Sequence, residues 1–317
     1  MKRNEELLNN TIIIAIGTFT TKILSFLMVP FYTLWLSPED YGTYDLLVTY
    51  ISFIIPFITL QLEQAIFRFC IEEKNNAKKY YSNAMHIIFL NIIICNIVVA
   101  LLMHKSEYFW PFMLYFNFYA IYNCSSEYLR GVEKLKFYSL TNVIVSVLII
   151  FLNIIFVYFL KIQVNGMLLS YGLAYLIGTL IILIKEKLFI SNNIKDNNVK
   201  KEMIKYSVPL IPNSISWWIT NVSDRKIINW FLGSFYNGIY AVACKIPLIV
   251  NLLFSVFNMS WQQTAITTLN DNDKKDYYNV MYNNLIKFLY TSSFCVLIFS
   301  KFIFKFLLNE EYYEGVK

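Results

Sequence analysis

Long apolar stretches separated by short polar joints run through most of this 317-residue chain. A helix that crosses a membrane needs about 20 largely apolar residues. Nine segments meet this requirement, with predicted bounds at 11–36, 43–69, 80–103, 107–129, 137–160, 163–185, 205–232, 236–264 and 277–300. The pattern therefore predicts an all-α, polytopic membrane protein.

The lysines and arginines near the ends of these segments lie mostly on one side. With the N-terminus in the cytoplasm, 17 of them fall on cytoplasmic joints, and only Lys105, Lys161, Lys301 and Lys305 fall on outer ones. Cytoplasmic loops carry such an excess of positive charge, so we predict a cytoplasmic N-terminus. The segment 11–36 is too long for a signal peptide and lacks a small-residue cleavage site, so it is expected to stay as the first span.

A gap-free shift of 196 residues aligns the two parts of the chain. It gives nine identities, and five of them fall between residues 78 and 85. The shift crosses an even number of spans, so it predicts two parallel repeats with a substrate path between them. We expect a six-helix N-terminal lobe at 1–200 and an incomplete C-terminal lobe of about three helices at 201–317. A composition that only imitates a repeat is the alternative.

The same shift pairs Lys317 with Ile121, inside the fourth predicted span. The second repeat therefore stops before its last three helices. We expect that these 317 residues are not a complete transporter, and that a fragment or an interrupted reading frame explains their length.

Composition narrows the possible functions. Hydrophobic residues make up 57% of the chain and charged residues 15%, with a mean hydropathy of +0.49. A soluble domain carries about 25% charged residues, so lipid must surround most of this chain. The net charge of +6 follows the predicted membrane topology and does not indicate a nucleic-acid partner.

Signals for enzyme chemistry are weak. The five cysteines have no CxxC spacing and the two histidines lie far apart, which disfavours a metal site or a disulfide framework. The chain has no GxxxxGK[ST] loop for ATP. Asp271, Asn272 and Asp273 have the DxD spacing of glycosyltransferases, but in a short loop with no surrounding domain. We expect neither an enzyme nor a bound cofactor.

Charged residues inside the predicted spans are the candidate site residues. A charge at the bilayer centre costs at least about 2.5–3.5 kcal/mol, so it needs a wet or paired environment. The residues predicted to line a translocation cavity are Lys22, Glu63, Arg68, Asp224, Arg225, Lys226, Lys245 and Lys287. Cations outnumber anions among them, and a cationic cavity suits an anionic substrate.

Three of these residues also have a structural explanation that involves no substrate. Arg68 is explained as a side chain that extends its guanidinium to the interface. Asp224 is explained as a partner of Arg225, or of a lysine in the other lobe, that holds helices together. Lys287 is explained as a lipid-facing residue that extends to the interface in the same way.

Two motifs carry a resemblance to a known family. The first hairpin holds Lys22, Pro30 and the turn Leu36-Ser37-Pro38-Glu39-Asp40-Tyr41-Gly42-Thr43-Tyr44, and the seventh span holds Asp224-Arg225-Lys226-Ile227-Ile228. From Asn10 to about Tyr313, the chain resembles the Wzx-type polysaccharide flippases of the multidrug/oligosaccharidyl-lipid/polysaccharide exporter superfamily. Members have twelve to fourteen helices in two six-helix lobes.

The resemblance implies a function and a location. It implies a transporter that flips an undecaprenyl-pyrophosphate-linked oligosaccharide repeat unit across the bacterial cytoplasmic (inner) membrane. A coupling ion, H⁺ or Na⁺, and other membrane proteins of polysaccharide assembly are its expected partners. The alternatives are a cation-coupled multidrug antiporter of the same superfamily and a membrane polysaccharide polymerase. The motifs favour the flippase, and the short outer joints disfavour the polymerase.

Overall fold

Helices form the regular structure of this protein. The computed structural model describes residues 17–188, 196–245 and 274–312 except 18, together with 247, 250, 251 and 254. Its α-helices are α2 (Val29–Trp35), α3 (Pro38–Thr59), α4 (Leu62–Glu72), α5 (Ala77–Met103), α6 (Phe109–Gly131), α7 (Leu135–Asn153), α8 (Gln163–Glu186), α9 (Asn197–Ser207), α10 (Ile211–Asn221), α11 (Asp224–Leu232), α12 (Ser234–Ala243) and α14 (Lys274–Leu307). The π-helical segment Ile154–Phe159 extends α7. No strand occurs within the described ranges, so the all-α prediction is confirmed.

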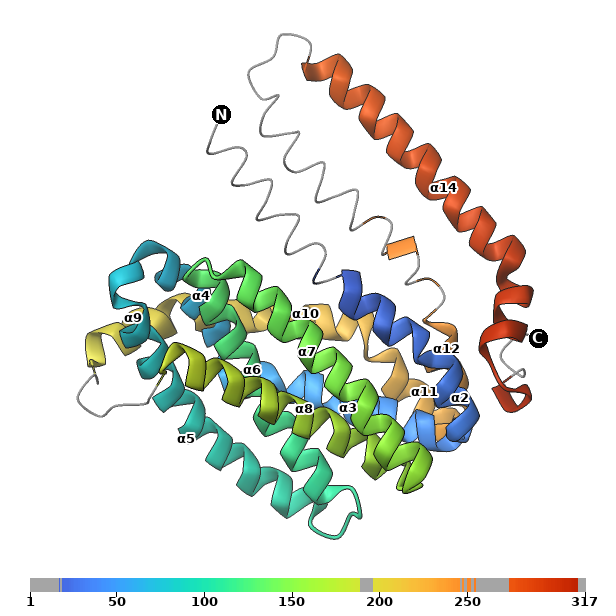
Figure 1. Ribbon diagram of the computed structural model, residues 1–317, viewed down its shortest axis with the longest axis horizontal. Helices are drawn as coiled ribbons and strands as arrows, with labels where there is room; N and C mark the ends of the chain where they lie inside the picture. Colours follow the sequence, from blue (N-terminus) through green and yellow to red (C-terminus); the bar gives the residue numbers. More distant parts are fainter. Residues whose placement is uncertain are drawn as a thin grey trace.

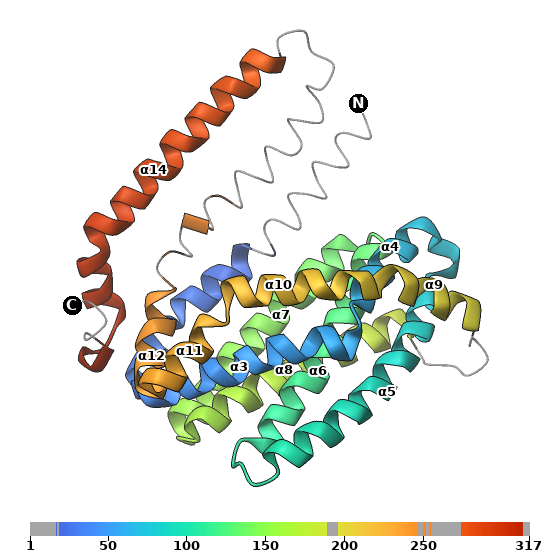
Figure 2. The same cartoon turned by 180° about the vertical axis from the view of Figure 1, so that it is seen from behind.

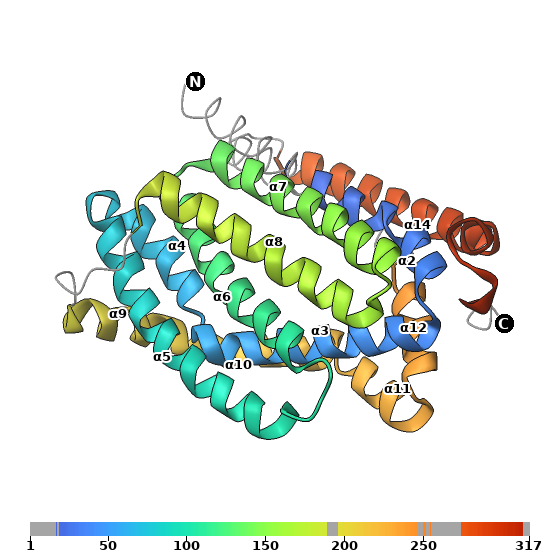
Figure 3. The ribbon, with the colours of Figure 1, turned by 60° about the horizontal axis from the view of Figure 1, so that its bottom comes forward.

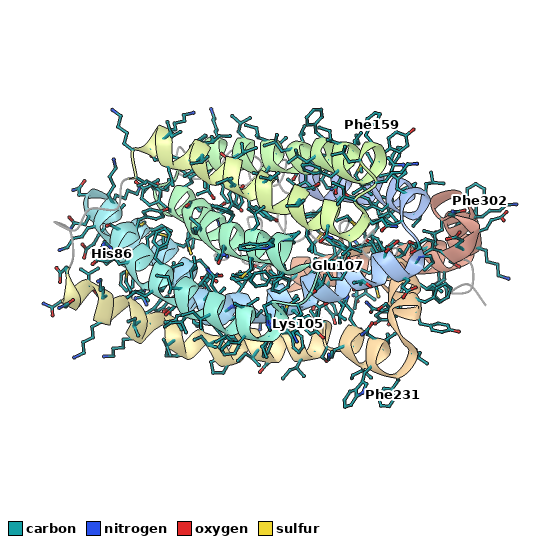
Figure 4. All side chains as sticks on the ribbon, turned by 90° about the horizontal axis from the view of Figure 1, so that it is seen from below. His86, Lys105, Glu107, Phe159, Phe231 and Phe302 are labelled. Carbon is teal, nitrogen blue, oxygen red and sulfur yellow. The ribbon has the colours of Figure 1, made fainter. Side chains whose placement is uncertain are left out.

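Several helices are long and apolar enough to cross a membrane. Five such spans lie in the described part of the chain: Pro38–Thr59, Lys74–Met103, Leu135–Phe159, Gln163–Glu186 and Tyr278–Phe302. Phe159, Phe231 and Phe302 point away from the helices and are 69%, 76% and 69% exposed (Figure 4). Such an outer surface requires an apolar solvent. The prediction of a polytopic membrane protein is confirmed.

The turn between the first two predicted spans starts α3 earlier than expected. The Ser37 hydroxyl accepts a hydrogen bond from the Asp40 backbone N–H at 3.1 Å, and Pro38 occupies the first helical position. This is the arrangement that favours a helix N-terminus. The helix therefore begins at Pro38, five residues before the predicted start of the span at residue 43.

The second predicted span, 43–69, is two helices rather than one. Leu60 and Gln61 adopt left-handed conformations with φ of 49° and 57°, and they separate α3 from α4. The Thr59 hydroxyl accepts the Gln61 backbone N–H at 3.2 Å, and the Asn91 amide donates to the Ile58 carbonyl at 2.9 Å. These side chains replace backbone hydrogen bonds that the break removes, and backbone groups without partners are costly inside a membrane.

The seventh predicted span, 205–232, is also interrupted. It contains the end of α9, a 3-10 turn at Val208–Leu210, and then α10 and α11. Pro209 and Pro212 lie in this region, and a turn at Val222 and Ser223 separates the last two helices. Since proline removes a backbone donor, a straight helix through this segment is disfavoured.

Two glycines bring α3 and α12 into close contact (Figure 3). The Asn237 amide donates to the Gly42 carbonyl at 2.7 Å. A Cβ on Gly42 would lie 2.6 Å from the Gly238 backbone nitrogen and inside the radius of the Ser234 carbonyl oxygen. A Cβ on Gly238 would overlap the Pro38 carbonyl oxygen in the same way. The 196-residue shift pairs Gly42 with Gly238 and Pro38 with Ser234, so both contacts join equivalent positions.

Helix α14 lies apart from the main bundle and approaches it near α2 (Figure 1). The Tyr312 hydroxyl, beyond the end of α14, donates to the Leu36 carbonyl at 3.0 Å, and the Tyr312 side chain is fully buried. The tail after α14 is thereby fixed at the turn between α2 and α3. The division into lobes at residue 200 stays a prediction.

Asp196 fixes the start of α9 against α5. Its carboxylate accepts the Asn198 N–H at 2.9 Å and pairs with the Lys79 ammonium at 2.7 Å, while its own N–H donates to the Asn83 amide oxygen at 2.9 Å. The Lys79 hydrogen bond, and then the backbone donors, lower the pKa of Asp196 below the ordinary value of 3.8.

We expect Asp196→Asn to lower the thermal unfolding temperature in detergent modestly, since the ion pair is partly exposed. A carboxylate whose pKa is lowered by folding stabilises the fold above its ordinary pKa and loses this effect as the pH falls through the folded value. The difference between wild type and Asp196→Asn should therefore be constant near neutral pH and should shrink below about pH 4. Glu202→Gln, on the exposed surface of α9, is the control. A difference that stays the same at low pH would contradict this role.

Candidate functional site

A cavity of about 590 Å³ lies between α10 on one side and α3, α6 and Gln61, just before α4, on the other. Figure 2 shows α10 alongside α3. The residues that line it are Ser52, Ile55, Pro56, Gln61, Tyr119, Asn213, Ser214, Ser216, Trp217, Trp218, Thr220 and Asn221. Amides, hydroxyls and indoles predominate, and none of these residues is charged. We call this space the α3–α10 cavity.

Trp218 joins the two walls of the α3–α10 cavity. Its indole N–H lies 3.2 Å from the Thr49 carbonyl and 3.1 Å from the Ser52 hydroxyl, and it donates to both. Its ring also lies 4.9 Å from the Phe53 ring. Trp217, on the same helix, is 61% exposed and makes no such bond. One indole is therefore held by packing, and the other is available to a ligand.

The left-handed pair at Leu60 and Gln61 forms part of the same wall. Because α3 ends there, the Gln61 side chain leaves the helix at the point where the cavity lies. Tyr119 of α6 completes this side. The break between α3 and α4 therefore places the Gln61 amide at the cavity. A continuous helix would point this side chain in another direction.

A cluster of charged residues lies about one helical turn beyond the cavity. The Arg225 Nε lies 2.8 Å from Asp45 Oδ2, and its NH1 lies 3.5 Å from Asp224 Oδ1. The Tyr240 hydroxyl donates to the other oxygen of Asp224. The Arg225 and Asp45 side chains are only 18% and 13% exposed, so this ion pair is largely removed from solvent. The contact is ionic, because Asp45 Oδ2 does not meet hydrogen-bond geometry.

Lys226 and Lys245 add positive charge to this cluster. The Lys226 ammonium donates to the Tyr50 hydroxyl and also lies 5.0 Å from the centre of that ring. Lys245 lies within electrostatic range of Asp45. Two carboxylates therefore face three cations, and Lys226 has no carboxylate partner among the described residues.

A second cavity, of about 300 Å³, lies among α6, α7 and α8. Tyr119 lines this cavity as well as the α3–α10 cavity. Glu127 contributes a carboxylate, and both of its oxygens accept from Arg130 NH1 at 2.8 Å. The Tyr122 hydroxyl donates to the Asn142 amide oxygen at 2.7 Å. All the described residues that line this second cavity lie within the first 200 residues of the chain.

The structure brings together four of the eight predicted site residues, namely Asp224, Arg225, Lys226 and Lys245. The others are separate from them. Glu63 is buried at 5% exposure, and its Oε2 has no hydrogen-bond partner among the described residues. None of the eight is among the described residues that line the α3–α10 cavity.

The remaining three predicted residues are exposed. Arg68 pairs with Glu72 at 2.8 Å and lies over the Tyr206 ring at 4.5 Å, a position that fits the structural interpretation of this residue. Lys22 and Lys287 are exposed on their helices. Their assignment to a translocation cavity stays a prediction. The DxD motif at 271–273 lies outside the described residues.

Sequence reasoning missed three parts of this site. Asp45 is a carboxylate inside the second predicted span. A charge inside a span is the property that selected the other candidate site residues, and it was sufficient to select Asp45 as well. Glu127, inside the fourth predicted span, had the same signal. Trp217 and Trp218 had no signal that separated them from the many aromatic residues of the chain.

Three comparisons place the chain among known proteins. A family model described as "Polysaccharide biosynthesis protein" matches residues 7–262. An uncharacterized membrane protein of Methanocaldococcus jannaschii, MJ1375, is 25% identical over 266 residues. That alignment covers 76% of this chain and 63% of the relative, so this chain spans less than two thirds of the relative's length.

Solved structures show the fold. The multidrug transporter DinF-BH of the MATE type, in complex with rhodamine 6G, gives a TM-score of 0.68 at 15% identity, over 96% of this chain and 75% of that one. An outward-facing multidrug resistance transporter of the MATE family gives 0.59 at 16% identity, over 93% and 71%. At this identity the likeness concerns the fold alone, which is that of a membrane transporter.

Proposed function

This chain belongs to the polysaccharide biosynthesis protein family, and we propose that it flips an undecaprenyl-pyrophosphate-linked oligosaccharide repeat unit across a bacterial cytoplasmic membrane. The substrate moves from the cytoplasmic to the outer leaflet by alternating access. The N-terminus lies in the cytoplasm, as the distribution of lysines and arginines predicts.

The observation that carries this proposal is the α3–α10 cavity. Its walls come from both predicted repeats, with α3, Gln61 and α6 on one side and α10 on the other. A polar space between two parallel repeats is where a transporter of this architecture holds its substrate. The volume of about 590 Å³ falls within the range of small-molecule sites.

Lys226 and Lys245 support a pyrophosphate-linked substrate. The carboxylates of Asp45 and Asp224 are already engaged by Arg225, which leaves these two ammonium groups for another anion. Ammonium groups replace the water around phosphate oxygens as strong charge-assisted donors. In the proposed mechanism a coupling ion, H⁺ or Na⁺, drives the return of the transporter to the state that is open to the cytoplasm.

The first test is complementation. The full reading frame that encodes this chain is expressed in a bacterium whose own flippase is deleted, and surface polysaccharide is measured. We expect Lys226→Ala to reduce export by at least about tenfold, the effect of one lost charge-assisted contact, and Lys226→Arg to retain part of it. Lys201→Ala, an exposed change on α9 outside the spans, is the control. Normal export by Lys226→Ala at equal protein level would exclude this residue from substrate binding.

A multidrug transporter is the second candidate, since the solved structures of this fold include the DinF-BH complex with rhodamine 6G. The aromatic lining of the α3–α10 cavity fits an organic cation as well as a sugar. Accumulation of this dye in cells that express the chain separates the two candidates. Export of the dye without restoration of surface polysaccharide would favour the drug transporter.

A further inference from the structure

We propose that the α3–α10 cavity receives the glycan part of the substrate and selects repeat units whose sugars are uncharged. This inference rests on the proposed function and specifies its substrate class. Sugars with carboxylates, such as uronic acids, are excluded. The pyrophosphate is held outside this cavity, at Lys226 and Lys245.

The lining of the cavity carries no charge to compensate an acidic sugar. All twelve of its described lining residues are neutral. The sequence segments 7–16 and 246–270 also contain no Asp, Glu, Lys or Arg. A carboxylate that left water for this space would therefore lose its hydration without gaining a cation.

The nearest cations lie outside the lining of the cavity. Arg225 pairs with Asp45 and Asp224, and Lys226 donates to Tyr50. Both lie on α11, past the turn that ends α10, whereas the cavity ends at Asn221. A carboxylate seated among the lining residues would therefore find no cation in the wall of the cavity.

The same lining suits a neutral sugar well. The Gln61 and Asn213 amides line the cavity and have no partner among the described residues, so each offers a donor and an acceptor to hydroxyl groups. Trp217 presents an exposed indole, and an aromatic face packs against the apolar C–H face of a sugar ring. Pockets of this kind combine aromatic walls with a few polar groups that fix orientation.

The experiment compares two substrates in vesicles that contain the full-length protein. One is a neutral hexose trisaccharide linked to undecaprenyl pyrophosphate, and the other carries a hexuronic acid in place of one hexose. We expect the neutral substrate to be flipped at least about tenfold faster, because the uronate would be buried without a partner.

Two substitutions test the cavity itself. Trp217→Ala should slow the neutral substrate, and Trp217→Phe should restore most of the rate because it keeps an aromatic face. Asn213→Arg should reduce the preference for the neutral substrate by at least about tenfold, since it supplies the missing cation. Asn198→Arg, on the exposed surface of α9, adds the same charge away from the cavity and should leave the preference unchanged.

The outcomes separate the two proposals. Equal flipping of both substrates, or faster flipping of the uronate, would overturn the neutral-glycan inference and leave the flippase function standing. An unchanged preference in Asn213→Arg at normal protein level would also overturn the inference. Flipping of neither substrate by wild-type protein would overturn the proposed function, and the inference with it.

Discussion

Transport is expected to be lost in Arg225→Gln, because the substitution removes the direct ion-pair partner of the buried Asp45. The two side chains are 18% and 13% exposed. Removal of one partner from a buried ion pair costs about 3–5 kcal/mol, most of it from the uncompensated charge that remains. The measurement is surface polysaccharide in a flippase-deleted strain, together with the thermal unfolding temperature of the purified protein.

A paired replacement distinguishes the ion pair from the individual residues. If Asp45 and Arg225 act by compensating each other, the double variant Asp45→Leu with Arg225→Met should be more stable than either single change, because neither member of the pair is left as a charge without its partner. Additive destabilisation in the double variant would show that the two residues act independently. Recovered stability without recovered transport would assign the charges to substrate handling.

Gly42→Ala and Gly238→Ala should each separate α3 from α12 and strongly reduce folded protein. A methyl group at either position would overlap a carbonyl oxygen of the facing helix, and backbone cannot move aside as a side chain does. Overpacking in a well-packed interior costs about 1–3 kcal/mol and occasionally more. Fluorescence-detected size-exclusion chromatography would measure the folded fraction.

The matched control lies next to the first glycine. Among the residues that the structure describes, the Thr43 hydroxyl bonds to the Glu39 carbonyl of its own helix and to no other partner, so Thr43→Ala should leave the folded fraction near the wild-type value. If Gly42→Ala behaved like Thr43→Ala, the close approach of α3 and α12 at this point would be wrong.

The fold class was predictable because lipid imposes a simple rule on the sequence. Apolar length alone located the helices α5, α7, α8 and α14, with ends that differ by several residues. The breaks were not predictable from length. Leu60 and Gln61 adopt positive φ although neither is glycine, because Thr59 and Asn91 supply the hydrogen bonds that the break requires. Asn91 is distant in sequence from the break, and Thr59 is the last residue of α3, directly before it.

The candidate site was predictable only in part. Charges inside apolar segments are rare, so Asp224, Arg225 and Lys226 stood out. Asp45, the partner of Arg225, comes from a helix about 180 residues away, and the pairing depends on how α3 and α11 pack. The cavity itself is uncharged, and no sequence pattern separates Trp217 or Gln61 from similar residues that face lipid.

The interrupted seventh span bears on how the protein enters the membrane during synthesis. Residues 224–226 place three charges in succession, and each costs about 2.5–3.5 kcal/mol at the centre of a helix that the translocon releases into lipid. Helices α10 and α11, at 11 and 9 residues, are each too short to cross the bilayer alone. Asp45 leaves the ribosome long before Arg225, so it is already in place as a counter-charge when this segment arrives. Insertion of the seventh span should therefore depend on the second, and a glycosylation-site reporter after residue 232 should detect its misinsertion when Asp45 is replaced by alanine.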